Sequence, residues 1–390
     1  MPRIAVIYQG IFQYDAVNAF AQALAEGFDA LGFQTVVLDT KNDEPGARAR
    51  LGELLTRPER IAFILGPGGI LADAAVGGQN LYGRFNVPYV AYLVDHPTYL
   101  LMRLAKAQNA LVTCIDRAHV DFLNAIGIAR AAYVPHGAAL PDRCRPWDER
   151  SGGIAFAAST SDDAALREHV ISELDPAQRD LMASIAEDPA IDTLSAVEAA
   201  VRAHPRAAGL GWTAGYDGSL IIFLNEADRL IRRRRRNRIV RELDEAGVAL
   251  DLYGRGWERF GFRHHRTHAP LDFPEMCAAL QTYRCALHLN PLFTAGLHER
   301  LLSAAVAGCA VITDGNAEID RLFPDGTAAI RIRPAQADWA EALVARLAGN
   351  DLAAVAAEGR RITARGESWA HRAGAIAALV DNYWPERARG

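Results

Sequence analysis

The chain has 390 residues, of which 50% are hydrophobic and 23% are charged, and this length predicts two domains because one core seldom serves so many residues. The net charge of −5 argues against a protein that its overall field draws to nucleic acid or to an anionic membrane. No apolar run approaches the roughly 20 residues of a transmembrane helix. Five scattered cysteines form no CxxC pair, which argues against disulfides and zinc and favours a cytoplasmic protein.

The first 150 residues alternate between short apolar runs and longer amphipathic stretches. Strands are predicted at residues 4–8, 35–38, 61–65, 89–94, 111–114 and 132–134, and a helix at 15–31. Strands that alternate with helices indicate βαβ units and a mainly parallel sheet. Residues 1–150 are therefore predicted to form a Rossmann-like domain, which we expect to hold an acceptor if the protein is a transferase.

Residues 151–218 differ in character, because much of this stretch is rich in Ala, Asp and Glu and carries little strand signal. Helices are predicted at 164–174, 176–187 and 193–203. We interpret the segment as a helical insertion or linker between two domains.

The alternation returns at residue 219 and predicts a second Rossmann-like domain over 219–366. A long helix is predicted at 220–246, followed by strands at 249–253, 285–290, 310–313 and 328–332. Residues 367–390 end the chain with a helix that we expect to pack back on the first domain. The predicted fold is therefore α/β, with two doubly wound domains and a helical insertion between them.

Ligands of doubly wound sheets bind at the carboxyl ends of the strands, so the residues directly after each strand are the candidates for a site. In the first domain these are Gly10, Asp95, His96 and His136, and in the second they are Gly254, Arg255, Trp257, Asn290 and Asp314. Neither domain carries a GxGxxG fingerprint or a Walker A motif after its first strand, which argues against a nicotinamide dehydrogenase and a P-loop NTPase.

The strongest local signal is His298-Glu-Arg300, which stands where a loop meets a helix of small residues. The free amides and the dipole of a helix amino terminus favour an anion such as a diphosphate. The guanidinium of Arg300 would add a bidentate phosphate contact, and Glu299 would accept hydrogen bonds from sugar hydroxyls.

This segment resembles the donor-binding motif of group 1 glycosyltransferases, most closely the spore-maturation (CgeB-like) branch. Three more pieces resemble the same branch in the same order: Val94-Asp-His-Pro97, Val134-Pro-His-Gly137 and Leu252-Tyr-Gly-Arg-Gly-Trp257. Together the four pieces span about residues 90–316.

The resemblance implies a GT-B fold and a glycosyltransferase of glycan biosynthesis whose co-substrate is a nucleotide-sugar, with no further cofactor and no metal. The residues predicted to contact the donor are Gly10, His136, Gly254, Arg255, Trp257, Asn290, His298, Glu299, Arg300 and Asp314. His96, oriented by Asp95, is the candidate for contacting the reacting sugar or for serving as base. One departure is that Ala295 and Ser303 stand where the family usually carries two glutamates.

Two other functions stay open at this stage. A nucleotide-sugar epimerase shares the fold, and a non-catalytic sugar- or nucleotide-binding protein would tolerate the serine at position 303. The acceptor is undetermined, and neither nucleic acid nor a transmembrane segment is expected. The run Arg232–Arg236 is interpreted mainly as a solvated helix surface with one or two ion pairs, and phosphate binding by one of its arginines is the alternative.

Overall fold

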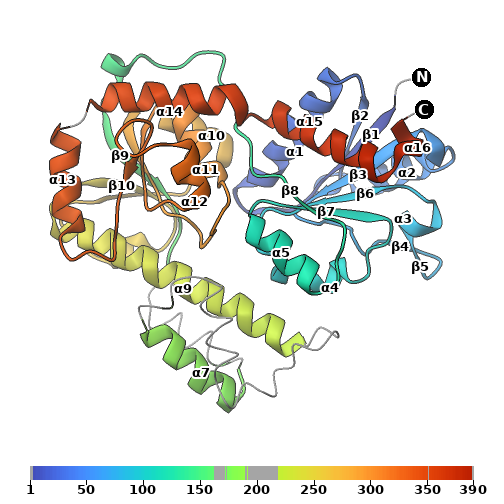
Figure 1. The fold of residues 1–390 in the computed structure, drawn as a ribbon, viewed down its shortest axis with the longest axis horizontal. Coiled ribbons are helices and arrows are strands. Elements are labelled where there is room, and N and C mark those ends of the chain that lie inside the picture. Colours follow the sequence, from blue (N-terminus) through green and yellow to red (C-terminus); the bar gives the residue numbers. More distant parts are fainter. Residues whose placement is uncertain are drawn as a thin grey trace.

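The computed structural model describes residues 3–161, 172, 174–188, 191, 218–349 and 351–388. Over these residues the chain forms two α/β domains that lie side by side (Figure 1). Each domain is built on a sheet of six strands, and every pairing within the two sheets is parallel. The predicted fold class is confirmed.

The first sheet has the strand order β2-β1-β3-β6-β7-β8. Its strands are β1 (Ile4–Gln9), β2 (Gln34–Asp39), β3 (Ile61–Pro67), β6 (Tyr89–Tyr92), β7 (Ala110–Cys114) and β8 (Ala131–Tyr133). Helices cover both faces, which explains why most of these strands are apolar throughout instead of alternating. The predicted strands of this domain are all present.

The helices of the first domain follow the apolar periodicity of the sequence. They are α1 (Ala16–Ala30), α2 (Glu44–Leu54), α3 (Leu81–Arg84), α4 (Leu101–Leu104) and α5 (Arg117–Ala125). In α1, Val17, Phe20, Leu24 and Phe28 are buried, because side chains at this spacing share one face of a helix. A short antiparallel ribbon, β4 (Ala75–Val76) with β5 (Gln79–Asn80), was not predicted.

The second sheet has the order β11-β10-β9-β12-β13-β14. Its strands are β9 (Gly152–Ala157), β10 (Leu250–Tyr253), β11 (Arg266–His268), β12 (Tyr283–His288), β13 (Ala310–Thr313) and β14 (Ile330–Arg331). The strand β9 corrects the predicted start of the insertion at residue 151, because Gly152–Ala157 lies between β10 and β12 inside the second sheet.

The insertion meets the second domain at its long helix α9 (Gly218–Glu245), which runs along the second domain and extends below the first (Figure 1). The helix α7 (Pro176–Glu187) lies against α9 and confirms the helix predicted there. The helices predicted at 164–174 and 193–203 lie almost wholly outside the described residues. Of the helices in the described ranges, none combines the length and apolar character that a bilayer span demands.

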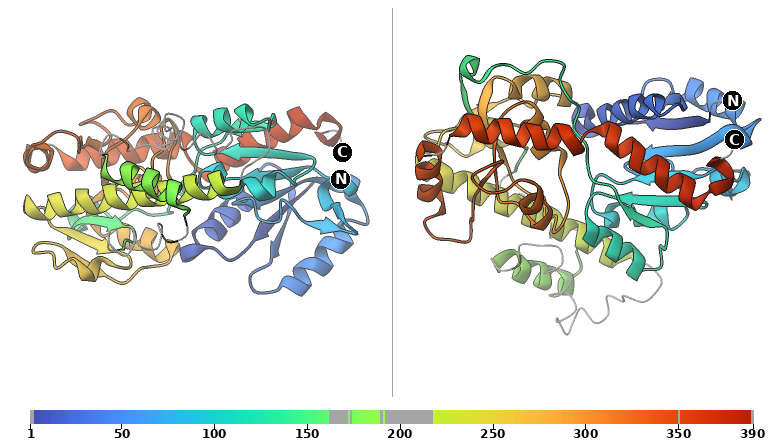
Figure 2. Two further views of the ribbon diagram at one scale, coloured as in Figure 1. Left: turned by 90° about the horizontal axis from the view of Figure 1, so that it is seen from below. Right: turned by 45° about the horizontal axis from the view of Figure 1, so that its top comes forward.

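The remaining helices follow α9, and the last of them carry the chain back to the first domain (Figure 2). They are α10 (Phe273–Leu280), α11 (Glu299–Val306), α12 (Ala317–Leu322), α13 (Trp339–Gly349), α14 (Leu352–Gly366), α15 (Trp369–Tyr383) and α16 (Pro385–Ala388). The helix α15 packs against α1, and the ring of Trp369 stacks on Phe20 with centroids 4.8 Å apart.

The chain passes between the domains twice, and the two crossings are hydrogen-bonded to each other. The Ala138 amide donates to the Glu367 carbonyl at 2.8 Å, and the Trp369 amide donates to the Ala138 carbonyl at 3.2 Å. Gly137 allows this approach, because a Cβ there would lie 2.8 Å from the indole of Trp369.

Candidate active site

The amino terminus of α11 stands at the boundary between the domains. His298 caps the helix, and its Nδ1 lies 3.2 Å from the Arg300 amide nitrogen and 2.7 Å from Glu299 Oε2. Glu299 Oε2 also lies 3.8 Å from Nε2 of His136, which belongs to the first domain. The Arg300 guanidinium donates to the carbonyl of Ala157, the last residue of β9, at 3.2 Å. The predicted group His298-Glu-Arg300 is thus held between the two sheets.

A carboxylate of the first domain fixes the loop that leads into α11. Asp116 is fully buried, and its carboxylate accepts hydrogen bonds from the Ala295 amide at 3.0 Å and the Thr294 hydroxyl at 3.3 Å. Burial raises the pKa of Asp116, and these donors oppose that effect. Asp116 was not among the predicted site residues, although it lies two residues after the end of β7, where the rule of strand ends also applies.

The arginines at 232–236 are all partly buried, so the interpretation as a mainly solvated helix surface is wrong, whereas the ion pairs expected with it are present. Arg232 Nε lies 3.0 Å from the carboxylate of Asp228 on the same helix, and Arg232 Nη1 lies 3.5 Å from Asp95 in the first domain. The reason is positional, because α9 runs along the second domain and reaches the first (Figure 2), where Asp95 contacts Arg232.

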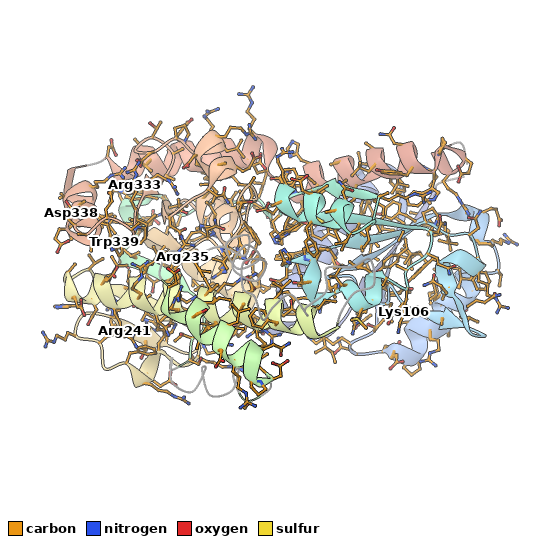
Figure 3. All side chains as sticks on the ribbon, turned by 60° about the horizontal axis from the view of Figure 1, so that its bottom comes forward. Lys106, Arg235, Arg241, Arg333, Asp338 and Trp339 are labelled. Atoms are coloured by element: carbon orange, nitrogen blue, oxygen red, sulfur yellow. The ribbon has the colours of Figure 1, made fainter. Side chains whose placement is uncertain are left out.

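Arg235 is also partly buried, with 19% of its side chain exposed. Figure 3 labels it on the second domain, where its Nη2 lies 2.7 Å from Asp314 at the end of β13. The Asp314 carboxylate also accepts a hydrogen bond from the Asn290 amide at 2.8 Å. Both of its partners belong to the protein, so these contacts are structural.

Unlike Arg232 and Arg235, Arg236 has no carboxylate within bonding distance among the described residues. Its guanidinium donates to the Ser159 carbonyl. Burial and the nearby guanidinium groups of Arg300, Arg232 and Arg233 lower the pKa of Arg236 to about 9. A guanidinium that lies beside other cations and has no carboxylate of its own would be stabilised by a bound anion.

We call the group of Arg232, Arg236, Arg300, Asp95 and Glu299 the inter-domain site. It combines two helices of the second domain with the end of β6 in the first. The Asp95 side chain keeps 53% of its surface exposed, so a ligand can reach its carboxylate. The surrounding protein raises the pKa of Asp95, and the nearby guanidinium of Arg232 opposes that effect, so Asp95 is a candidate proton acceptor.

His96 lies next to this site, but its partners differ from the predicted ones. Its Nδ1 lies 2.9 Å from the hydroxyl of Thr98 and caps the 3-10 helix Pro97–Tyr99. The ring packs edge-to-face on His119 with centroids 4.5 Å apart. Thr98, and not Asp95, orients His96, because the carboxylate of Asp95 is turned to Arg232.

Gly10, Gly254 and Asn290 have structural reasons for their identities. A Cβ on Gly10 would lie 2.4 Å from Ile70, and one on Gly254 would lie 2.2 Å from the carbonyl of Ala158. The side-chain amide of Asn290 donates to the Phe293 carbonyl at 2.6 Å and shapes the loop before α11. These contacts lie within the protein and leave a direct role toward a donor without structural support.

Trp257 is a core residue and not a surface for a nucleotide base. It is fully buried, and its indole nitrogen donates to the Ala158 carbonyl at 2.5 Å. Arg255, in contrast, is exposed and lies over the ring of Tyr14 from the first domain, 5.9 Å from its centroid.

Several solved structures have a fold similar to that of this chain. Sucrose-phosphate synthase from Thermosynechococcus elongatus is 13% identical, with a TM-score of 0.52 over 98% of this chain and 99% of that one. Anabaena HepE in complex with UDP-glucose is 10% identical, with a TM-score of 0.53 over 97% and 99%. An alpha-glucosyltransferase in complex with UDP and a 13-mer DNA is 8% identical, with a TM-score of 0.55 over 97% and 100%. The chain has the GT-B fold of glycosyltransferases.

A family relationship appears over part of the chain. Residues 232–378 match the family model described as glycosyl transferase-like, and this range contains the arginines of α9 and the whole of α11. No curated protein sequence matches the chain significantly. Family and fold together support glycosyl transfer as the general activity.

Proposed function

We propose that the protein transfers a sugar from a nucleotide-sugar donor to an acceptor bound by the first domain. The observation that carries the proposal is the gathering of Arg236, Arg300 and Arg232 between the domains, with Arg236 partly buried and without a carboxylate partner among the described residues. A nucleotide diphosphate would supply the anionic partner that Arg236 lacks.

In the proposed reaction, the bond between the sugar's anomeric carbon and the diphosphate oxygen breaks while an acceptor oxygen forms a new bond to that carbon. Arg236 and Arg300 stabilise the charge that develops on the leaving diphosphate, as preorganised cations do in a site with little water. The acceptor hydroxyl gives its proton to Asp95, whose carboxylate is exposed to a ligand at the end of β6. Glu299 accepts hydrogen bonds from the hydroxyls of the donor sugar.

We further propose that the guanidinium groups take the part that a divalent metal plays in other transferases, so that transfer needs no metal. The proposal is supported by the number of arginines at the site and not by any feature of the acceptor. Activity that survives EDTA and is not raised by added Mg²⁺ would agree with it.

The branch and biology of the enzyme are also proposals. The four motifs support the spore-maturation branch of group 1 glycosyltransferases and a part in glycan biosynthesis, and the five free cysteines support a reducing, cytoplasmic location. HepE was solved with UDP-glucose, so UDP-sugars are the first donors to test here.

The test begins with thermal unfolding of the purified protein against UDP-, GDP-, dTDP-, ADP- and CMP-sugars, followed by product analysis with the donor that binds. A ligand at 100 times its Kd stabilises a protein by about 2.7 kcal/mol, which shifts the melting temperature measurably. Arg236→Ala and Arg300→Ala should each weaken donor binding by about 10- to 100-fold, since each removes a charged hydrogen bond. Arg238→Ala is the matched control on the same helix, because Arg238 is half exposed and pairs with Glu242.

The outcomes separate the candidate functions. Transfer only in the presence of an acceptor supports the transferase, and a changed sugar with donor alone supports an epimerase. Binding without either reaction supports a non-catalytic protein, and equal donor affinity in Arg236→Ala, Arg300→Ala and the parent would remove the inter-domain site as the donor site.

A further inference from the structure

The loop after β1 holds two consecutive residues in a backbone conformation that side chains disfavour. Tyr14 has φ 55° and ψ 19°, and Asp15 has φ 55° and ψ 12°. Left-handed geometry costs free energy for every residue that carries a Cβ, so it persists only where surrounding contacts enforce it. The loop runs from Gly10 to Asp15 and lies at the carboxyl edge of the first sheet.

Contacts within the first domain enforce this conformation. The Asp15 carboxylate accepts hydrogen bonds from the Asn18 side chain at 2.7 Å and from the Lys41 ammonium at 2.9 Å. Asn18 in turn accepts from the Gly10 amide at 3.0 Å and donates to the Gly10 carbonyl at 2.8 Å. Both ends of the loop are therefore tied to the start of α1.

The tied loop carries Tyr14 to the second domain. The Tyr14 hydroxyl lies 2.6 Å from the hydroxyl of Ser159, in the segment that follows β9. Ser159 is also a junction within its own domain, because its hydroxyl accepts from the Arg255 amide at 3.1 Å and its carbonyl accepts from the guanidinium of Arg236.

We propose that Tyr14 is a positioning residue that couples the closure of the two domains to the placement of Arg236. The inference rests on the proposed function, because it takes Arg236 as a group that binds the donor diphosphate. While the hydrogen bond between the Tyr14 and Ser159 hydroxyls is intact, contacts from both domains hold Ser159 in place. The Ser159 carbonyl then keeps the guanidinium of Arg236 in the inter-domain site. When the bond is lost, the segment after β9 is free to move with the second domain.

The direct test replaces only the hydroxyl. Tyr14→Phe should raise the KM for the nucleotide-sugar about three- to tenfold, the range expected for one hydrogen bond, while kcat at saturating donor changes by less than twofold. Tyr283→Phe is the matched control, since it removes a tyrosine hydroxyl 2.8 Å from another hydroxyl, that of Tyr253, inside the second domain. If the Tyr14 hydroxyl only stabilised the fold, both variants would lose stability, and Tyr14→Phe would not raise the KM more than Tyr283→Phe does.

A double-mutant cycle tests the partner. Ser159→Ala should show the same rise in KM, and the double variant Tyr14→Phe, Ser159→Ala should be no worse than either single variant. The proposal would be overturned if the two rises in KM multiply in the double variant. It would also be overturned if Tyr14→Phe has the same KM as the parent.

Small-angle X-ray scattering of the ligand-free protein gives a readout that needs no donor. Tyr14→Phe should have a larger radius of gyration than the parent and than Tyr283→Phe, and identical radii would count against the coupling. If the parent binds no nucleotide-sugar, the proposed function fails, whereas an active parent with an unaffected Tyr14→Phe variant removes only the inference about Tyr14.

Discussion

Arg235 and Asp314 form an ion pair of 2.7 Å that joins the middle of α9 to the carboxyl end of β13. The Asp314 side chain is 1% exposed and the Arg235 side chain 19%, so water does little to screen the pair. The ion pair fixes the helix that carries Arg236 against the sheet that carries the loop before α11.

Arg235→Ala should therefore destabilise the protein by about 3–5 kcal/mol, the usual result of leaving a buried charge without its partner. Urea unfolding of the variant beside Arg238→Ala would measure this, and the control should lose less than about 0.5 kcal/mol. A loss in Arg235→Ala as small as in the control would show that Asp314 finds other compensation.

Asp116 provides a second prediction, because it links the two domains through the loop before α11. Asp116→Ala leaves the amides of Ala295 and Ala118 without their acceptor, so we expect a loss of about 2–4 kcal/mol in the free energy of unfolding. Asp116→Asn keeps one acceptor oxygen and should lose less. The order of the two variants in thermal unfolding is the check, and equal losses would contradict a role for these hydrogen bonds.

Stability should fall in acid because of the buried histidines. Burial lowers the pKa of His119 and of His136 to about 3, whereas a histidine in the unfolded chain titrates near 6.5. The unfolded state thus binds more protons below pH 6.5, and each histidine removes up to about 1.4 kcal/mol per pH unit as pH falls from about 6.5 toward 3.

The pH series should be run with a variant that lacks one of these groups. His119→Phe should flatten the slope of unfolding free energy against pH, while His264→Gln, at an exposed position, should leave the slope unchanged. Equal slopes in the parent and His119→Phe would assign the acid sensitivity to other groups.

Asp95→Asn tests the proposed proton acceptor. The change keeps the size of the side chain and removes its basicity, so kcat should fall by about 100- to 10,000-fold, the range typical of general base catalysis. Donor affinity and the melting temperature should change little, because Asp95 is half exposed and its bond to Arg232 is long at 3.5 Å. An unchanged kcat would remove Asp95 from the chemical step.

Much of the fold was predictable from local patterns. Apolar runs such as 61–65 and the helical spacing of Val17, Phe20 and Leu24 fix strands and helices with little help from distant residues. The strand β9 was missed because its apolar core, Ile154–Phe156, is short and is followed by alanines, which favour strands weakly. Its place between β10 and β12 depends on pairing with strands far along the chain.

The site was harder to predict because residues at strand ends are also needed for packing. His298-Glu-Arg300 lies where the motif indicated, but Trp257 and Gly254 are explained by the contact between the segments after β9 and β10. The arginines of α9 could not be ranked from the sequence, since only the position of the helix beside both domains decides which of them is buried. Asp116 and Tyr14 gain their roles from partners in the other domain.

The stacking of Trp369 on Phe20 bears on how the protein is made. The core of the first domain includes side chains of α15, which lie beyond the whole second domain in the chain. On a ribosome the first sheet emerges early, yet the part of its domain's core that α15 completes stays uncovered until the last helices have been synthesised. The second domain, contained between the two crossings, can complete its own core sooner. We expect the half of the protein translated first to be the last to reach its native state, and to need protection from aggregation during that interval.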